Sequence, residues 1–118
     1  MRTQTEELLN HAANIIAEKL GQDLVALDMS NQQLLSDVFL IATASNERLL
    51  AAICDELLEQ TAVMGEKPVR MEKSSGWILL DYVDLVIHLQ TQEIRNYYAL
   101  ERLWNDSPRI ELAVSTLR

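Results

Sequence analysis

The strongest constraint on the fold is the segment Val38–Thr43 (VFLIAT), in which five of the six residues are apolar. The run is too short for a typical helix, and its β-branched and aromatic residues favour a strand. A strand that is apolar on both faces must be covered on both faces, which is typical of a central strand in a layered α/β fold. We therefore expect this segment in the middle of a sheet that carries packed helices.

The rest of the chain divides into helical and strand patterns. Apolar residues recur at helical spacing in the long segments, and short apolar runs bounded by turn residues predict strands. Glycine and proline are scarce, three and two, and they fall between these elements. In chain order we expect a helix over 5–20, strands over 24–28 and 38–43, a helix over 45–64, strands over 69–72, 77–82 and 85–90, and a helix from 91 to about 104.

This order, α-β-β-α-β-β-β-α, predicts the architecture. Hairpins joined to helical crossovers imply an α/β (α+β) single domain, with a mixed five-stranded sheet and three main helices. A chain of 118 residues is the length of one domain. We place that domain at residues 1–104 and expect residues 105–118 to form a loosely held C-terminal tail.

Composition excludes several classes of function. The net charge of −8 argues against nucleic-acid binding through phosphate neutralisation, because that mode needs a surplus of Lys and Arg. The sequence contains no apolar run near the roughly 20 residues of a membrane span. Its N-terminus lacks the pattern of a signal peptide. We expect a soluble cytoplasmic protein with no membrane partner and no sequence-specific nucleic-acid partner.

The charge is uneven along the chain. Residues 1–65 carry three basic and ten acidic side chains, whereas residues 66–118 carry seven and eight. Solvated helix faces explain this most simply. An acidic surface that meets a basic protein is the other interpretation.

Motifs for catalysis are missing from the sequence. It has no glycine-rich phosphate loop and no G-x-S-x-G turn, and His11 and His88 lack metal-ligand spacing. The single cysteine, Cys54, excludes an intramolecular disulfide and a multi-cysteine zinc site. We expect no catalytic residue, cofactor or metal. Cys54 is interpreted as a small core residue, and His88 as a sheet-face histidine bonded to a neighbour.

The last predicted helix has an unusual apolar arc. The arc contains Ile94, Tyr97, Tyr98, Leu100, Glu101 and Trp104, whereas Arg95 and Arg102 lie outside it. Two interpretations of Glu101 stay open: a core glutamate satisfied by a tyrosine, an indole or a histidine, or a charge within a partner surface. Core positions are favoured for Tyr97 and Ile94, while Trp104 and Tyr98 at the edges of the arc are more open to contact.

The strand over 77–82 is apolar on both faces. Trp77, Leu79 and Asp81 point one way, and the alternate residues point the other way. If three helices leave part of a five-stranded sheet uncovered, the exposed apolar part would bind a partner. The alternative is a sheet buried on both faces.

Three segments, SDVFLIAT (36–43), WILLDYVDLVIHL (77–89) and RNYYALERLW (95–104), resemble the ribosomal silencing factor family, also called the Iojap-like family. The resemblance extends over residues 5–104. It implies a domain related to the nucleotidyltransferase fold without its catalytic motif, and a protein that is not an enzyme. It further implies binding to the large ribosomal subunit through its ribosomal protein fourteen, which blocks subunit joining and represses translation under nutrient limitation or in stationary phase.

The resemblance also implies a partner-binding set in which aromatic residues and carboxylates face a basic ribosomal protein. The set is Trp77, Asp81, Tyr82, Asp84, Arg95, Tyr98, Glu101 and Trp104. Two positions depart from the family pattern: Leu49 replaces a frequent histidine, and Val83 replaces the usual glycine. Because valine disfavours a positive φ, the turn at Val83 is expected to differ, which leaves the placement of Asp84 open.

Two other functions stay open. One is a residual nucleotide-binding or nucleotidyltransferase-like protein that uses Asp37, Asp81 or Asp84. The other is a homodimeric adaptor that uses the open sheet face or the last helix.

Overall fold

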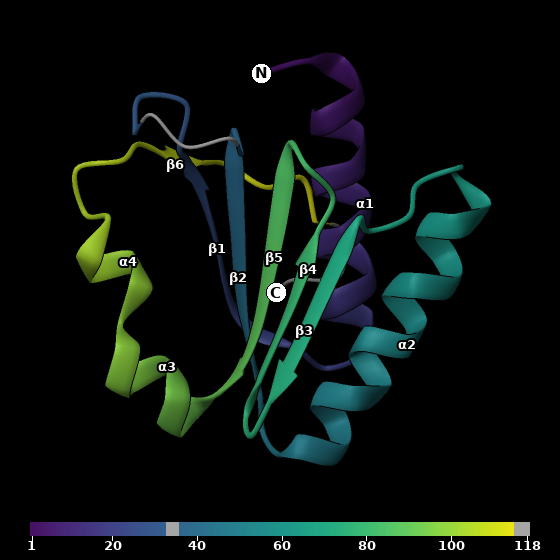
Figure 1. Cartoon of the computed structure of the whole chain (residues 1–118), viewed down its shortest axis with the longest axis vertical. Helices are drawn as coiled ribbons and strands as arrows, with labels where there is room; N and C mark the ends of the chain where they lie inside the picture. Colours follow the sequence, from purple (N-terminus) through teal and green to yellow (C-terminus); the bar gives the residue numbers. More distant parts are fainter. Residues whose placement is uncertain (33–35, 115–118) are drawn as a thin grey trace.

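The centre of the molecule is a mixed sheet with the strand order β3-β4-β5-β2-β1-β6 (Figure 1). The computed structural model describes residues 1–32 and 36–114, so the end of the predicted tail lies outside the described residues. Along the chain the elements are α1 (Thr3–Glu18), β1 (Gln22–Asp28), β2 (Val38–Ala44), α2 (Glu47–Val63), β3 (Arg70–Ser74), β4 (Trp77–Asp81), β5 (Leu85–Thr91), α3 (Gln92–Tyr98), α4 (Leu100–Leu103) and β6 (Arg109–Ile110).

The apolar segment that begins at Val38 is a central strand, as predicted. β2 pairs in parallel with β5 and antiparallel with β1, while β4 pairs antiparallel with β3 and β5. Most residues of β2 and β5 are buried. This mixed sheet confirms the predicted α/β (α+β) single domain.

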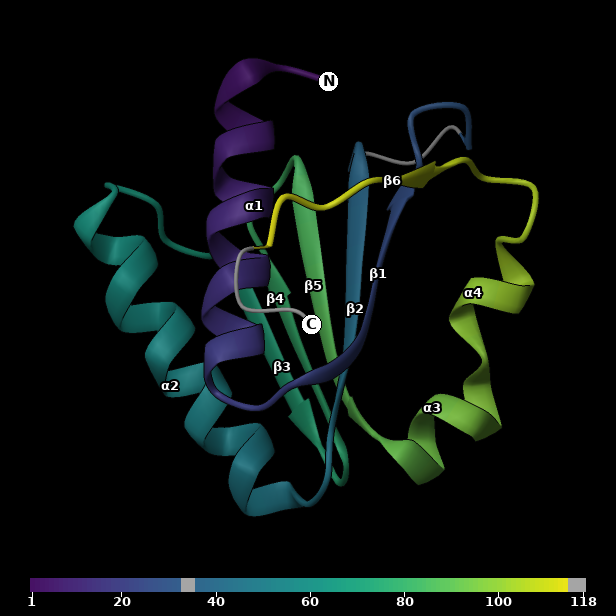
Figure 2. The same ribbon diagram turned by 180° about the vertical axis from the view of Figure 1, so that it is seen from behind.

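Helices cover both faces of the sheet (Figures 1 and 2). α1 and α2 pack on one face, with side chains such as Leu40, Leu80 and Ile87 in the larger core cluster. α3 and α4 pack on the other face, where Leu100 joins a smaller cluster with Ile41. Within the described residues, no helix is long and apolar enough to cross a membrane.

The prediction of five strands is wrong by one, because β6 adds a sixth strand from the segment that we assigned to the tail. Ile110 pairs with Ala26 of β1. Further along, the N–H of Ala113 donates to Asn10 Oδ1 at 2.9 Å, and Asn14 Nδ2 donates to the Ala113 carbonyl at 2.9 Å. Residues 109–114 therefore lie along β1 and α1 (Figure 2). A two-residue strand has too little alternation to be recognised in the sequence.

The last predicted helix is broken in two. Ala99 is not a helical residue: its φ of 46° and ψ of 56° are left-handed, and they separate α3 from α4. The break changes which side chains face the sheet. Arg95 is 5% exposed and Tyr97 is 79% exposed, which is the reverse of the arc expected for one continuous helix.

Candidate functional site

A partly exposed aromatic surface joins β4 to α3. Trp77, the first residue of β4, is half-buried, and Tyr98 at the end of α3 is 48% exposed. Their ring centroids are 4.8 Å apart. Together with Leu79 they line a hollow of about 310 Å³ that is bordered by Glu72 and Ser74. We call Trp77, Leu79 and Tyr98 the aromatic patch.

A tight turn fixes the start of β4. Gly76 has a φ of 77°, and a Cβ built there would lie 2.7 Å from Ile94 Cγ1 and 2.9 Å from Thr91 Oγ1. The Gly76 N–H donates to Glu47 Oε1 at 3.1 Å, and its carbonyl accepts from the Thr91 N–H at 2.9 Å. Glycine is required here because both the positive φ and the close approach of α3 exclude a side chain. The turn therefore fixes the position of Trp77 at the start of β4.

His88 lies beneath the aromatic patch on β5. The Trp77 indole Nε1–H donates to His88 Nδ1 at 3.2 Å. The His88 ring packs edge-on against the ring of Phe39, with the two ring centroids 4.8 Å apart. Burial lowers the pKa of His88 to about 4, so the imidazole is neutral at pH 7. This confirms the interpretation of His88 as a sheet-face histidine that is bonded to a neighbour.

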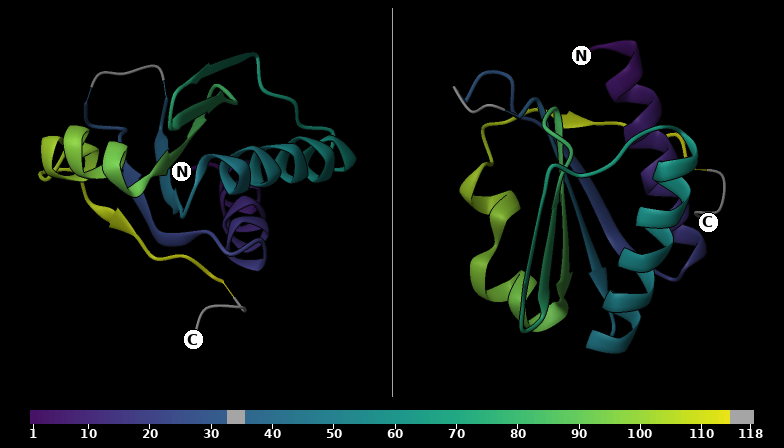
Figure 3. Two further views of the ribbon diagram at one scale, coloured as in Figure 1. Left: turned by 90° about the horizontal axis from the view of Figure 1, so that it is seen from below. Right: turned by 45° about the vertical axis from the view of Figure 1, so that its right-hand side comes forward.

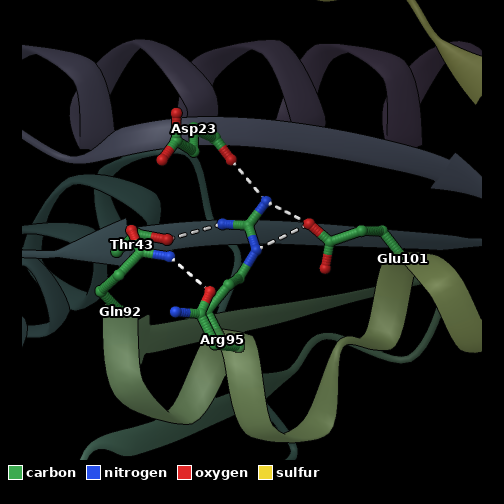
Figure 4. Close-up of polar contacts among 6 residues, drawn as sticks. Asp23, Thr43, Gln92, Arg95 and Glu101 are labelled. Carbon is green, nitrogen blue, oxygen red and sulfur yellow. Dashed lines mark hydrogen bonds and ion pairs between the residues drawn. The ribbon is translucent and has the colours of Figure 1, made fainter.

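Arg95 is the centre of a polar network under α3 (Figure 4). Its guanidinium donates to Glu101 Oε2 at 2.9 Å, to Thr43 Oγ1 at 2.7 Å and to the Asp23 carbonyl at 2.7 Å. Burial alone would raise the pKa of Glu101, but hydrogen bonding and the charges of Arg95 and Arg109 lower it below its usual value. The partner of Glu101 is thus an arginine, and none of the tyrosine, indole or histidine partners considered above.

The network borders a larger hollow that is lined by residues of β1 and of the α3–α4 segment. The ribbons of these elements are drawn from two further sides in Figure 3. The hollow has a volume of about 620 Å³, and its lining includes Asp23, Gln92, Asn96 and Arg102. Arg95 lines it as well, and each of its three guanidinium nitrogens already donates to Glu101, Thr43 or Asp23.

The two carboxylates at the end of β4 are each paired with an arginine. Asp81 Oδ1 accepts from the Val83 N–H at 2.8 Å, and its Oδ2 lies 3.6 Å from Arg70 Nε. Asp84 pairs with Arg2 at 3.4 Å. Val83 between them has a φ of 76°, so this valine holds the left-handed conformation that glycine adopts without strain. The valine therefore does not abolish the positive φ.

Tyr82 belongs to the opposite side of the sheet. Its side chain is 7% exposed, and its hydroxyl lies 2.9 Å from Thr61 Oγ1 of α2. It packs in the larger core cluster under α1 and α2. Trp104, by contrast, is half-buried against the smaller cluster on the α3–α4 side.

The structure therefore divides the predicted partner-binding residues into three groups. Trp77, Tyr98 and Asp81 are on the partly open face, while Arg95, Glu101 and Trp104 hold the α3–α4 segment. Tyr82 and Asp84 are not part of the aromatic patch. The exposure of Tyr97 was not predicted from the sequence. A left-handed residue that ends a helix is usually glycine, but residue 99 is alanine, so the break after α3 could not be recognised.

The titratable groups do not form a metal centre within residues 1–32 and 36–114, where no cluster of three or more His, Cys, Asp or Glu residues could hold an ion. Cys54 is fully buried, and burial raises the pKa of its thiol. This confirms its interpretation as a core residue.

Known proteins resemble the chain over nearly its whole length. The model of the family described as "Ribosomal silencing factor during starvation" matches residues 2–117. Ribosomal silencing factors from Halalkalibacterium halodurans and Bacillus subtilis are 37% and 34% identical, over 91% of this chain and 93% and 92% of theirs. A crystal structure from Bacillus halodurans superposes with a TM-score of 0.78 at 36% identity, covering 91% of this chain and 99% of the other. The chain belongs to the ribosomal silencing factor family.

Proposed function

We propose that this protein binds the large ribosomal subunit through ribosomal protein fourteen and sterically blocks association with the small subunit, which represses translation when nutrients are short. Membership of the family supports a role in ribosome silencing. The observation that carries the choice of surface is the contact between Trp77 and Tyr98, a half-exposed aromatic pair at the margin of an otherwise covered sheet face.

The aromatic patch has the composition of a binding hot spot. Tryptophan and tyrosine dominate binding energy at interfaces, and they do so when neighbours exclude water from them. Trp77 is already held by the core below it, so little side-chain entropy is lost when a partner covers it. The partner would bury the exposed parts of Trp77, Leu79 and Tyr98.

Charge supports a basic partner. Glu72 borders the hollow of the patch, and Asp81 lies on the same face of β4 as Trp77. Arg70 offsets them in part, because it contacts both carboxylates. The net charge of −8 would steer the protein toward a basic ribosomal protein and away from exposed ribosomal RNA.

The proposed contact residues are thus Trp77, Tyr98 and Asp81. Arg95, Glu101 and Trp104 act indirectly, because they hold the helices that place Tyr98. Tyr82 supports the sheet from the opposite face.

Co-sedimentation with purified large subunits tests this proposal. We expect wild-type protein to bind large subunits and isolated ribosomal protein fourteen, and to reduce subunit joining measured by light scattering. Trp77→Ala should weaken binding by about 30-fold, the effect of losing a hot spot worth about 2 kcal/mol. Tyr98→Ala should weaken it less, since its ring is more exposed.

The matched control is Val63→Ala, which truncates an apolar residue that is 86% exposed at the end of α2. It should bind like the wild type. The proposal is wrong if the wild type binds neither target at micromolar concentration. The choice of surface is wrong if folded Trp77→Ala binds as tightly as Val63→Ala.

A further inference from the structure

We propose that His88 is a positioning residue, which holds the Trp77 indole in the orientation that the partner requires. This inference rests on the proposed function, because it assigns a role at the same surface. It adds a residue that makes no contact with the partner.

The position of His88 follows from strand register. On the paired strands β4 and β5, His88 is opposite Leu79, and Trp77 is opposite Gln90. Trp77 and His88 are therefore diagonal neighbours on one sheet face, close enough for long side chains to meet. The indole N–H points at His88 Nδ1 over 3.2 Å, and the ring centroids are 5.9 Å apart.

This hydrogen bond fixes the protonation of the imidazole. An indole N–H can only donate, so Nδ1 must be the acceptor and the ring proton is assigned to Nε2. Nε2 is buried and has no hydrogen-bond partner in the described structure. An unpaired buried donor destabilises the fold, and an apolar residue would avoid that cost. What the imidazole supplies in return is an acceptor for Trp77.

His88 is itself held rigidly. It is 5% exposed, and its ring packs edge-on against Phe39 on the neighbouring strand β2. The ring of Tyr98 contacts Trp77 in turn, so four rings are in consecutive contact. Phe39, His88, Trp77 and Tyr98 thus connect the sheet to the surface, and the orientation of Trp77 determines how both patch aromatics are presented.

Two substitutions separate positioning from simple support of the fold. His88→Leu keeps an apolar side chain of similar size but removes the acceptor. His88→Asn places an amide oxygen near the position of Nδ1 and restores an acceptor. In the free full-length protein, the ¹H–¹⁵N resonance of the Trp77 indole reports whether the hydrogen bond is present. Trp77→Phe assigns that resonance against the indole of Trp104.

We expect His88→Leu to fold with an unchanged or higher melting temperature. Its Trp77 indole N–H should move to a solvent-like shift and lose protection from exchange. Its affinity for large subunits should fall about fivefold to tenfold, the range expected for one lost hydrogen bond. His88→Asn should recover most of the indole signature and most of the affinity.

The proposal is overturned if His88→Leu keeps the wild-type indole resonance or the wild-type affinity while Trp77→Ala binds weakly. In that case the partner surface stands without a role for His88. It is also overturned if affinity falls only in proportion to lost stability and His88→Asn does not restore it. If Trp77→Ala binds as tightly as the wild type, the partner surface itself is wrong, and the role of His88 falls with it.

Discussion

Arg95 and Glu101 form an ion pair at 2.9 Å that connects α3 to α4 across the left-handed residue Ala99. The Arg95 side chain is 6% exposed and the Glu101 side chain 26%, so the pair is much less screened by solvent than an ordinary surface pair. Because Arg95 also bonds to β1 and β2, the pair fastens both short helices to the sheet (Figure 4).

Glu101→Ala should lower the free energy of unfolding by about 2 kcal/mol, because it leaves the buried Arg95 charge without a counter-ion. The matched control is Glu72→Ala, which breaks the exposed pair with Arg70 and should cost less than about 1 kcal/mol. Urea denaturation measures both. Equal costs for the two substitutions would show that the Arg95–Glu101 pair does not hold the segment.

Most of the fold could be predicted from periodicity. The all-apolar segment that begins at Val38 identified the central strand, and helical spacing with a capping residue identified α2, whose Asn46 side chain accepts from the Leu49 N–H. Periodicity failed at the end of the chain. The break at Ala99 and the pairing of Ile110 with β1 depend on tertiary contacts, which a local pattern does not contain.

The sequence predicted which face of β4 carries the candidate site, but not which residues of other elements belong to it. Alternation along β4 placed Trp77, Leu79 and Asp81 together. It could not show that Tyr98 contacts Trp77, because that contact depends on where α3 ends. It also could not show that Arg95 is buried. A helical wheel drawn for one unbroken helix places Arg95 outside the apolar arc, whereas the broken helix turns Arg95 toward the sheet.

Gly76→Ala should destabilise the protein far more than Gly65→Ala. Both glycines have a positive φ, 77° and 83°, so both substitutions incur backbone strain of about 1 kcal/mol. Only Gly76 adds a collision, because its new Cβ would lie 2.7 Å from Ile94 Cγ1, whereas nothing lies within 4 Å at Gly65. We expect about 3 kcal/mol for Gly76→Ala.

Thermal or urea denaturation of the two variants provides the comparison. Gly76→Ala should also perturb the Trp77 indole resonance, because Trp77 follows the turn directly. Similar stability of the two variants would mean that α3 moves away from the turn without cost.

Val83→Gly should stabilise the protein by about 1 kcal/mol. A β-branched residue at a φ of 76° is strained, and glycine removes that strain, although it gains freedom in the unfolded chain. Because Val83 is 49% exposed, little buried apolar area is lost. Val83→Ala, which keeps a Cβ, should gain less. A loss of stability in Val83→Gly would show that valine is held in this conformation by packing.

His88 makes stability depend on pH in a definite direction. Its pKa is about 4 in the folded protein, against an ordinary value near 6.5, because burial disfavours the charged ring. The unfolded chain therefore binds a proton below about pH 6.5 that the folded protein does not accept until about pH 4. Stability from this residue is complete above pH 7, falls as the pH is lowered toward 4, and is constant below that.

The difference between a pKa of 6.5 in the unfolded chain and about 4 in the folded protein corresponds to about 3 kcal/mol, of which about 2 kcal/mol is lost by pH 5. We expect the free energy of unfolding of the wild type, measured in urea, to fall by that amount between pH 7.5 and pH 5. His88→Leu has no group to titrate at this position, so its stability should decline less over the same interval, and the difference between the two curves isolates the imidazole. This window lies above the range in which most carboxylates protonate, so Glu101 and the other acids contribute little to it. Parallel curves for the wild type and His88→Leu would mean that the folded protein accepts a proton on His88 as readily as the unfolded chain does, which would contradict its burial beneath Trp77.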